Sequence, residues 1–227
     1  MMCPRLPGAM RTWCMMAAIA MVLACGCVFA ARQNDDESRK LALAQLHSPD
    51  ADLRLAACAV LAEIGRQEDL PLVQRHLFDD DERVRGTAEA TIWSIWSRSG
   101  DAATDRLFER GVEQMRDGRL RIAVTTFNQV IAMRPGFAEG WNKRATVYFL
   151  LGEDELSLKD CDEVIKRNPQ HFGVLAGYGQ IYLRKGELQR ALDYFEQALA
   201  INPNMAGVQA SIEAVREIMI KRGRRFI

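Results

Sequence analysis

Apolar side chains recur three and four residues apart along most of the chain, which is the spacing of one face of an α-helix. The segment QRALDYFEQALAINP, residues 189–203, shows the pattern through Ala191, Phe195 and Ala198. Pro203 then ends the segment, because proline lacks an N–H and clashes with the preceding helical turn. Alternating Val, Ile and Thr are scarce, whereas Ala, Leu, Glu, Arg and Gln, which favour helix, are abundant. The pattern predicts an all-α protein.

The same pattern returns every 34 residues between residues 104 and 203. A small residue lets two helices approach, a glycine ends the first helix, and a proline ends the second. Each period therefore predicts one pair of helices joined by a tight turn. The repeated columns are Leu107, Trp141 and Leu175; Gly111, Ala145 and Gly179; Gly118, Gly152 and Gly186; Ala123, Ser157 and Ala191; Phe127, Cys161 and Phe195; Val130, Val164 and Ala198; and Pro135, Pro169 and Pro203.

These columns make residues 104–203 resemble three tetratricopeptide repeats. The resemblance implies an α-solenoid, in which stacked helix pairs bury a continuous core, and residues 205–222 would be the capping helix that closes it. Gln114 departs from the column held by Tyr148 and Tyr182. Ser157 and Cys161 are smaller than usual in their columns, which predicts thinner packing in the second pair.

A second period, of 31 residues, lies before residue 98, where Leu46, Asp50 and Arg54 recur as Leu77, Asp81 and Arg85. Residues 36–98 resemble two short HEAT repeats, and each aspartate is expected to cap the helix that follows it. We expect this unit to stack on the tetratricopeptide array through the joint at residues 99–101.

Trp93 and Trp96 replace Ala62 and Gly65 of the earlier HEAT-like copy. Two such large rings predict that a larger element covers this face, and the helix that starts near Asp101 is the nearest one along the chain. The alternative is that one ring is buried and the other is half exposed.

Residues 1–30 have the parts of an export signal. Arg5 and Arg11 precede an uncharged run, Thr12–Ala31, and the small residues before position 31 favour cleavage after Ala30. The sequence LACGC also fits a bacterial lipobox, with lipidation at Cys25 or Cys27. A run of about twenty uncharged residues is also long enough for a retained anchor. All three readings place the body outside the cytoplasm, either periplasmic or tethered to a membrane through its N-terminus.

The rest of the sequence shows no catalytic chemistry. Thirty Lys and Arg balance thirty Asp and Glu, so no nucleic-acid partner is predicted. His47, His76 and His171 lack the spacing of metal ligands, and no nucleophile or phosphate-binding motif occurs. Beyond the signal, Cys58 and Cys161 are predicted to be small core residues. We therefore expect a non-enzymatic protein without catalytic residues, metal or cofactor.

The resemblance also implies where a partner would bind, because ligand contacts in this family usually come from the first helices, which line the concave side. The corresponding residues are Phe108, Val112, Met115, Asn142, Thr146, Phe149, Gln180 and Leu183. Phe108 and Phe149 have the alternative role of inter-helix core. Family members that grip a C-terminal carboxylate use Lys, Asn and Arg at defined positions. In this sequence those positions hold Phe108, Val112, Lys143, Gly173 and Gly177, so the complete clamp is absent.

The absence of that clamp disfavours chaperone tails and favours a partner helix or an extended apolar peptide. The sequence thus predicts an interaction scaffold or adaptor of the cell envelope. The alternative function is a HEAT-repeat lyase-type enzyme, or an accessory subunit of an envelope enzyme.

Overall fold

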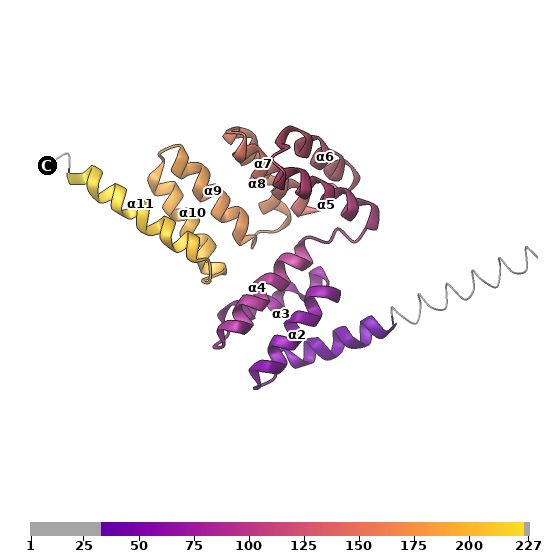
Figure 1. Cartoon of the computed structure of the whole chain (residues 1–227). Coiled ribbons are helices and arrows are strands. Elements are labelled where there is room, and N and C mark those ends of the chain that lie inside the picture. The colour runs from indigo at the N-terminus through magenta and orange to yellow at the C-terminus, as the bar shows by residue number, and fades with distance from the viewer. Residues whose placement is uncertain (1–32, 225–227) are drawn as a thin grey trace, which may run out of the picture.

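The computed structural model describes residues 33–224, and all regular secondary structure in this range is helical (Figure 1). The predicted all-α class is confirmed. The predicted export signal, with Cys25 and Cys27, lies outside the described residues. Within residues 33–224, no helix has both the length and the apolar character that crossing a bilayer would require.

The N-terminal half begins with a helix over residues 33–45. It continues with α2 (Ala51–Ile64), the short 3-10 turn η1 (Gln67–Asp69), α3 (Leu70–Arg75), the 3-10 turn η2 (His76–Phe78) and α4 (Glu82–Trp96). The C-terminal half comprises α5 (Ala102–Arg116), α6 (Leu120–Met133), α7 (Ala138–Leu150), α8 (Asp154–Arg167), α9 (Phe172–Arg184), α10 (Leu188–Ile201) and α11 (Ala206–Arg224).

The two copies of the 31-residue period form α2 and α4, which pack against each other. Asp50 accepts a hydrogen bond from the backbone N–H of Asp52, and Asp81 accepts one from that of Arg83. The predicted caps are therefore present. The inner faces of the two helices supply Leu61 and other fully buried side chains of the core.

The 34-residue period forms three helix pairs, α5 with α6, α7 with α8, and α9 with α10, and α11 closes the last pair. Gly118, Gly152 and Gly186 follow the first helices with φ of 73°, 78° and 76°. This left-handed conformation is nearly free of strain only for glycine, so these residues turn the chain into the second helix. Val208 and Val215 of α11 are buried on the last pair, as the cap requires.

The small-residue column determines how closely the two helices of a pair approach. A Cβ atom on Gly111 would lie 2.7 Å from Cε1 of Phe127, and one on Gly179 would lie 2.4 Å from ring atoms of Phe195. In the second pair the glycine is replaced by Ala145, and the aromatic ring by the smaller Cys161. The larger residue at the first position and the smaller residue at the second keep the summed side-chain volume similar, so the two helices stay in contact without an aromatic ring.

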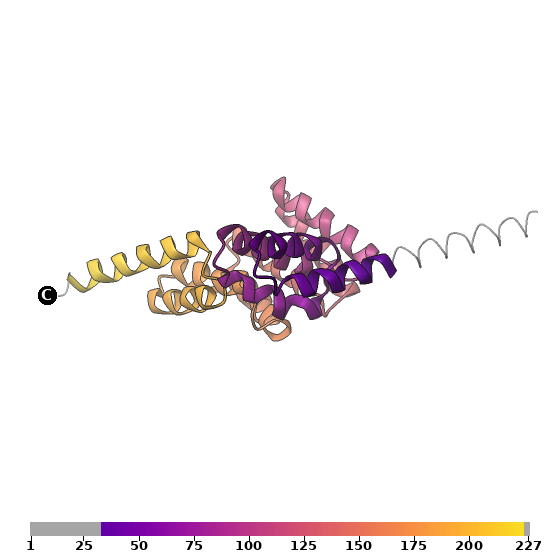
Figure 2. The same cartoon turned by 90° about the horizontal axis from the view of Figure 1, so that it is seen from below.

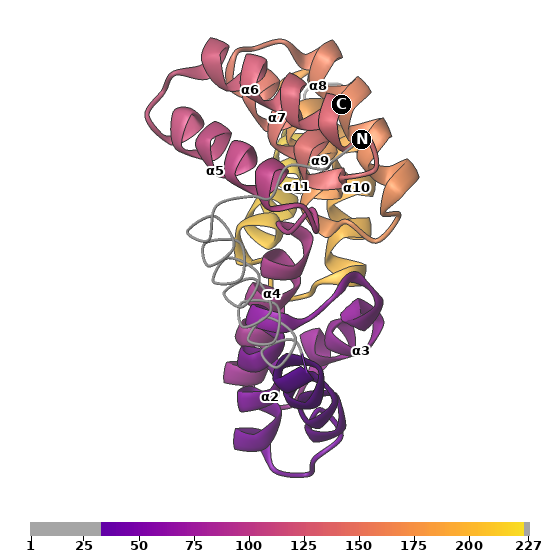
Figure 3. The same cartoon turned by 90° about the vertical axis from the view of Figure 1, so that its right-hand side faces the viewer.

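The two halves pack side by side, with the N-terminal half beneath the C-terminal arc in Figures 1 and 3. Figure 2 views the same arrangement from below, with α11 extending past the N-terminal half. Asn204, between α10 and α11, donates to the carbonyl of Leu77 at 2.8 Å and accepts from Arg85 Nε at 3.0 Å. The contact thus reaches the far end of the array and not only the joint at residues 99–101.

The expectation that the helix after Asp101 covers the tryptophan pair is wrong, and the alternative, with one ring buried and the other half exposed, is confirmed. Trp96 is 3% exposed and packs on His171 and Phe172 at the start of α9, while Trp93 is half-buried beside the same two rings. A Cβ atom on Gly173 would lie 2.5 Å from Cη2 of Trp93. The third helix pair approaches so closely because its first turn carries a glycine there.

Candidate functional site

The C-terminal half contains a small cavity of about 120 Å³ between α7, α8 and α9, which is called the groove cavity below. Asn142, Thr146 and Phe149 line it from α7, and Gln180 lines it from α9. These are four of the eight residues that the sequence assigns to partner binding, and the structure brings them together on one cavity.

Missing side-chain volume creates this cavity. Ser157 and Cys161, the two residues that are small for their columns, form part of its wall, and Gly173 and Gly177 form another part. A Cβ atom on Gly177 would meet no heavy atom within 4 Å, so the helix backbone is bare at this point. The packing of the second pair is therefore thin at Ser157 and Cys161, as predicted, and the space they leave is part of this cavity.

Polar groups at the cavity are held in fixed orientations. The side-chain amide of Asn142 donates to both carboxylate oxygens of Glu139, at 3.2 and 3.0 Å. Thr146 Oγ1 donates to the carbonyl of Asn142 at 3.0 Å, and Gln180 Nε2 donates to Ser211 Oγ at 3.2 Å. Both amide nitrogens are engaged within the fold, which fixes the orientation of the two amides.

Phe149 forms a wall of the cavity. The guanidinium of Arg184 lies 3.8 Å from its ring centroid and donates to its carbonyl at 2.9 Å. Arg184 also pairs with Asp154 of the preceding repeat. Such a stacked cation fixes the ring and shields one face of it, so the half-buried Phe149 presents a preorganised apolar surface.

The other four predicted residues do not line this cavity. Phe108 is 4% exposed and packs against Phe127 and Phe137, so it is inter-helix core and is not available to a partner. Val112 and Met115 pack on the same cluster, and Leu183 packs on the core of the last repeats. These residues lie on the first helices of their pairs, as predicted, but their side chains pack against the core between the helices.

A buried polar chain beside the cavity was not predicted. His171 is fully buried, and its Nε2 lies 2.6 Å from Oε1 of Glu139. Its Nδ1 accepts from the backbone N–H of Val174 at 3.2 Å, so the ring proton belongs on Nε2 and is donated to the carboxylate. The imidazole stacks on Trp96 with ring centroids 4.2 Å apart.

Burial, the largest single effect, raises the pKa of Glu139, but the hydrogen bond and charge of His171, the charge of Lys143 and the hydrogen bond from Asn142 together hold the pKa below its ordinary value. The carboxylate is therefore ionised, and it links Asn142 at the cavity to the contact between the two halves. The sequence offered no signal for this pair, since Glu139 and His171 lie on different repeats and follow no known spacing.

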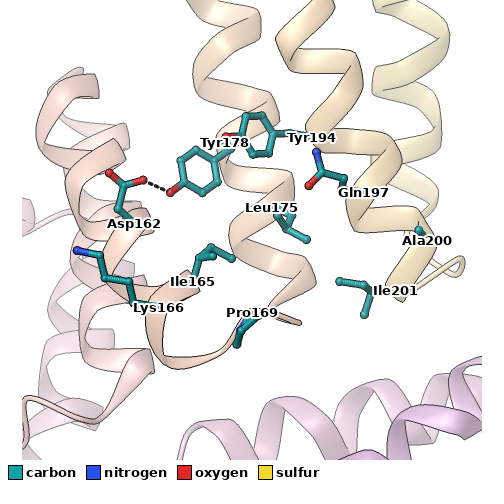
Figure 4. Close-up of a pocket in the computed structure, with 10 residues that line it drawn as sticks. All are labelled: Asp162, Ile165, Lys166, Pro169, Leu175, Tyr178, Tyr194, Gln197, Ala200 and Ile201. Carbon is teal, nitrogen blue, oxygen red and sulfur yellow. Dashed lines mark hydrogen bonds between the residues drawn. The ribbon is translucent and has the colours of Figure 1, made fainter.

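A larger and more open depression, of about 620 Å³, lies between α8, α9 and α10 (Figure 4). Ile165, Leu175 and Ile201 give it an apolar floor. Tyr178 and Tyr194 stack at one end with centroids 4.6 Å apart, and the Tyr178 hydroxyl donates to Asp162. Burial and the neighbouring carboxylate raise the pKa of Tyr178, so the phenol stays protonated.

Neither cysteine within residues 33–224 is an activated nucleophile. Cys58 and Cys161 are free and buried, as predicted, and burial raises the pKa of their thiols to about 11 and about 12. Within residues 33–224, no three His, Cys, Asp or Glu side chains gather in a way that could hold a metal ion. The cavity can accept an apolar side chain, and its rim can accept hydrogen bonds.

Comparison with protein families assigns the repeats. Models of the tetratricopeptide repeat match residues 108–171 and 173–205, and a model of HEAT repeats matches residues 16–123. The molecule is thus an α-solenoid, with a small hollow between α7, α8 and α9. Its chain carries HEAT repeats followed by tetratricopeptide repeats.

Individual relatives agree with this assignment. A TPR repeat-containing protein of Rhizobium etli is 31% identical over 122 residues, which cover 54% of this chain and 60% of that protein. The Sgt2 TPR domain from Aspergillus fumigatus has a TM-score of 0.52 at 16% identity, over 55% of this chain and 83% of that one. The first TPR of Spaghetti, bound to an HSP90 peptide, has a TM-score of 0.50 at 18% identity, over 52% and 93%. At these identities the two solved structures show the fold alone.

Proposed function

We propose that this chain is a non-enzymatic interaction adaptor that holds an apolar side chain of a partner helix or extended segment in the groove cavity. The observation that carries the proposal is the bare backbone at Gly177 inside a hollow of about 120 Å³. Apolar cavities of about 150 Å³ accept a molecule the size of benzene, so this one suits a single aliphatic side chain. Amide oxygens at the rim would fix the backbone of the partner.

The peptide bound to the TPR of Spaghetti supports a peptide-binding role for the repeats. The chemistry of the groove favours a different peptide here. Gly173 and Gly177 contribute no cation, and Lys143 is already engaged with Glu139 at 3.8 Å and with the Trp93 ring at 5.5 Å. A terminal carboxylate would find no free positive side chain at the cavity, so an apolar anchor is the better ligand.

We further infer that the adaptor works in the cell envelope, because Thr12–Ala31 has the pattern of an export signal or anchor. Cleavage, lipidation at Cys25 or Cys27, and a retained anchor predict different masses for the mature N-terminus. An unmodified chain that starts at Ala31 would contradict lipidation, and a chain that keeps residues 1–30 would contradict cleavage.

The binding proposal is tested by filling the cavity. No heavy atom lies within 4 Å of a Cβ atom at Gly177, so the side chain of Gly177→Leu can extend into the hollow and occupy it. Gly207→Leu is the matched control, since Gly207 is exposed on α11 and equally unobstructed. Affinity purification from the envelope fraction should recover a partner with the wild type and with Gly207→Leu, and lose it with Gly177→Leu.

Circular dichroism and thermal unfolding must show that both variants remain folded. Retention of the same partner by folded Gly177→Leu would contradict binding in the cavity. Phe149→Asp supplies an independent check, because it places a charge on the apolar wall of the same hollow.

A further inference from the structure

The contact between the two halves leaves a cleft of about 650 Å³, separate from the groove cavity. The end of α4 and residues 98–99 form one side of it. The loop between α6 and α7, the start of α7 and the end of α8 form the other side. Residues of both repeat types thus contribute to one hollow, which neither half forms alone.

The cleft carries an excess of positive charge. Arg98, Arg134 and Arg167 line it, and the acidic residue in its lining is Glu139. That carboxylate is only 1% exposed and already holds His171 and Asn142. The cations of the cleft are therefore not neutralised from within it.

The three arginines differ in what they hold. Arg98 donates to the carbonyls of Ala62 and Gly65, and Arg167 pairs with Glu163. The guanidinium of Arg134 makes no hydrogen bond to residues 33–224. Its nearest carboxylate there is Asp101 at 4.0 Å.

Asp101 holds Arg134 only loosely, because its Oδ1 lies 4.0 Å from the guanidinium, beyond hydrogen-bond distance, while its Oδ2 accepts from the N–H and the hydroxyl of Thr104. Arg134 is about half exposed. It is thus a cation at the mouth of the cleft that can turn toward an incoming anion.

Two further features bear on the choice of ligand. The N-terminus of α7 opens on the cleft at Phe137 and Ala138, where no side chain caps its N–H groups, while the Glu139 carboxylate in the same first turn offsets part of the helix dipole. Trp96 also lines the cleft, and its buried Nε1 has no hydrogen-bond partner within the described part of the chain. Met133 and Pro135, both exposed, add an apolar surface beside these donors.

We propose that this junction cleft binds an acidic segment of a partner protein, with an Asp or Glu carboxylate on Arg134 and an adjacent apolar side chain on Met133 and Pro135. Complementary charge is the basis of this assignment, since the cleft offers cations and donors and leaves no free acid. The site lies outside the groove, and the proposal does not depend on the function proposed for the groove.

Fluorescence anisotropy with the purified full chain tests the proposal. The probe is a fluorescein-labelled peptide of alternating Glu and Leu, and its counterpart carries Gln in place of Glu. Arg134→Gln is the test variant. Arg110→Gln is the control, because Arg110 is exposed on α5, appears in no ion pair within residues 33–224, and changes the net charge equally.

The wild type should bind the Glu peptide at least about ten-fold more tightly than the Gln peptide, with an affinity that falls as salt rises. Arg134→Gln should weaken binding by about ten-fold, and Arg110→Gln by less than about two-fold, since the loss of a charged hydrogen bond has this magnitude. Gly177→Leu, which blocks the groove, should leave the affinity unchanged.

Three results would overturn the proposal: no binding of the Glu peptide, equal binding of the two peptides, or equal effects of the two arginine substitutions. Loss of binding on Gly177→Leu would instead place the acidic peptide in the groove, which also contradicts the cleft. Failure of the groove experiment leaves these outcomes unaffected, so the two proposals can be separated.

Discussion

Two glycines on α9, two residues apart, should respond in opposite ways to the same substitution. A Cβ atom on Gly177 meets nothing within 4 Å, whereas a Cβ atom on Gly179 would lie 2.4 Å from Cδ1 and Cε1 of Phe195. Carbon atoms in favourable contact lie about 3.5–4.0 Å apart, so Gly179→Ala requires movement of more than an ångström. Phe195 is fully buried among the core residues of the last repeats and has no open space into which it can shift.

The magnitudes follow from two effects. Replacing glycine by alanine within a helix stabilises it by about 0.5–1 kcal/mol, because the unfolded chain loses conformational freedom. Overpacking of a filled core costs about 1–3 kcal/mol. Gly177→Ala should therefore raise the free energy of unfolding by about 0.5–1 kcal/mol, and Gly179→Ala should lower it by about 1–2 kcal/mol.

Urea unfolding followed by circular dichroism measures both values, with the slope compared between variants so that a change in midpoint reports stability. For a chain of this size each kcal/mol corresponds to about 2–4 °C in thermal midpoint. Gly207→Ala, in open space on α11, is the control for helix propensity and should behave like Gly177→Ala. If Gly179→Ala is as stable as the wild type, the close approach of helices through the glycine column is wrong.

Two further predictions concern the N-terminal half. Trp96→Ala should lower the free energy of unfolding by about 3–5 kcal/mol, because it removes a buried ring from His171 and Phe172; an unchanged thermal midpoint would place the ring outside the junction. The hydrogen bonds from Arg54 hold the pKa of Asp79 below its usual range. The stability it contributes is full above the unfolded-state pKa of about 3.9 and is lost as the pH falls through the lower folded value. Urea midpoints at neutral and acidic pH should therefore fall less for Asp79→Asn than for the wild type, and parallel declines would refute this.

The side chains of charged residues show how local pattern and tertiary contact differ. The sequence spacing predicts that Glu155 pairs with Lys159 on its own helix, but Glu155 pairs with Lys185 of the next repeat. Glu163 does pair with Arg167, as the spacing indicates. Long side chains choose among neighbours within reach, and only the stacking of repeats defines the neighbours across a helix pair.

The sequence by itself determined the helix pairs and their turns, the aspartate caps of α2 and α4, and the closing helix of this protein. It also indicated that the second pair would pack thinly at Ser157 and Cys161, which is where the groove cavity opens. These features depend on contacts between residues less than one repeat apart, and the period of 34 residues records them directly.

Only the tertiary structure decided that α9 covers Trp96, that Phe108 is core while Phe149 lines the groove, and that a basic cleft lies between the halves. Periodicity specifies which face of a helix is apolar, but not which distant element will bury it. That choice depends on the curvature that accumulates from small rotations between repeats and on close contacts such as that of Gly173 with Trp93, which no local pattern contains.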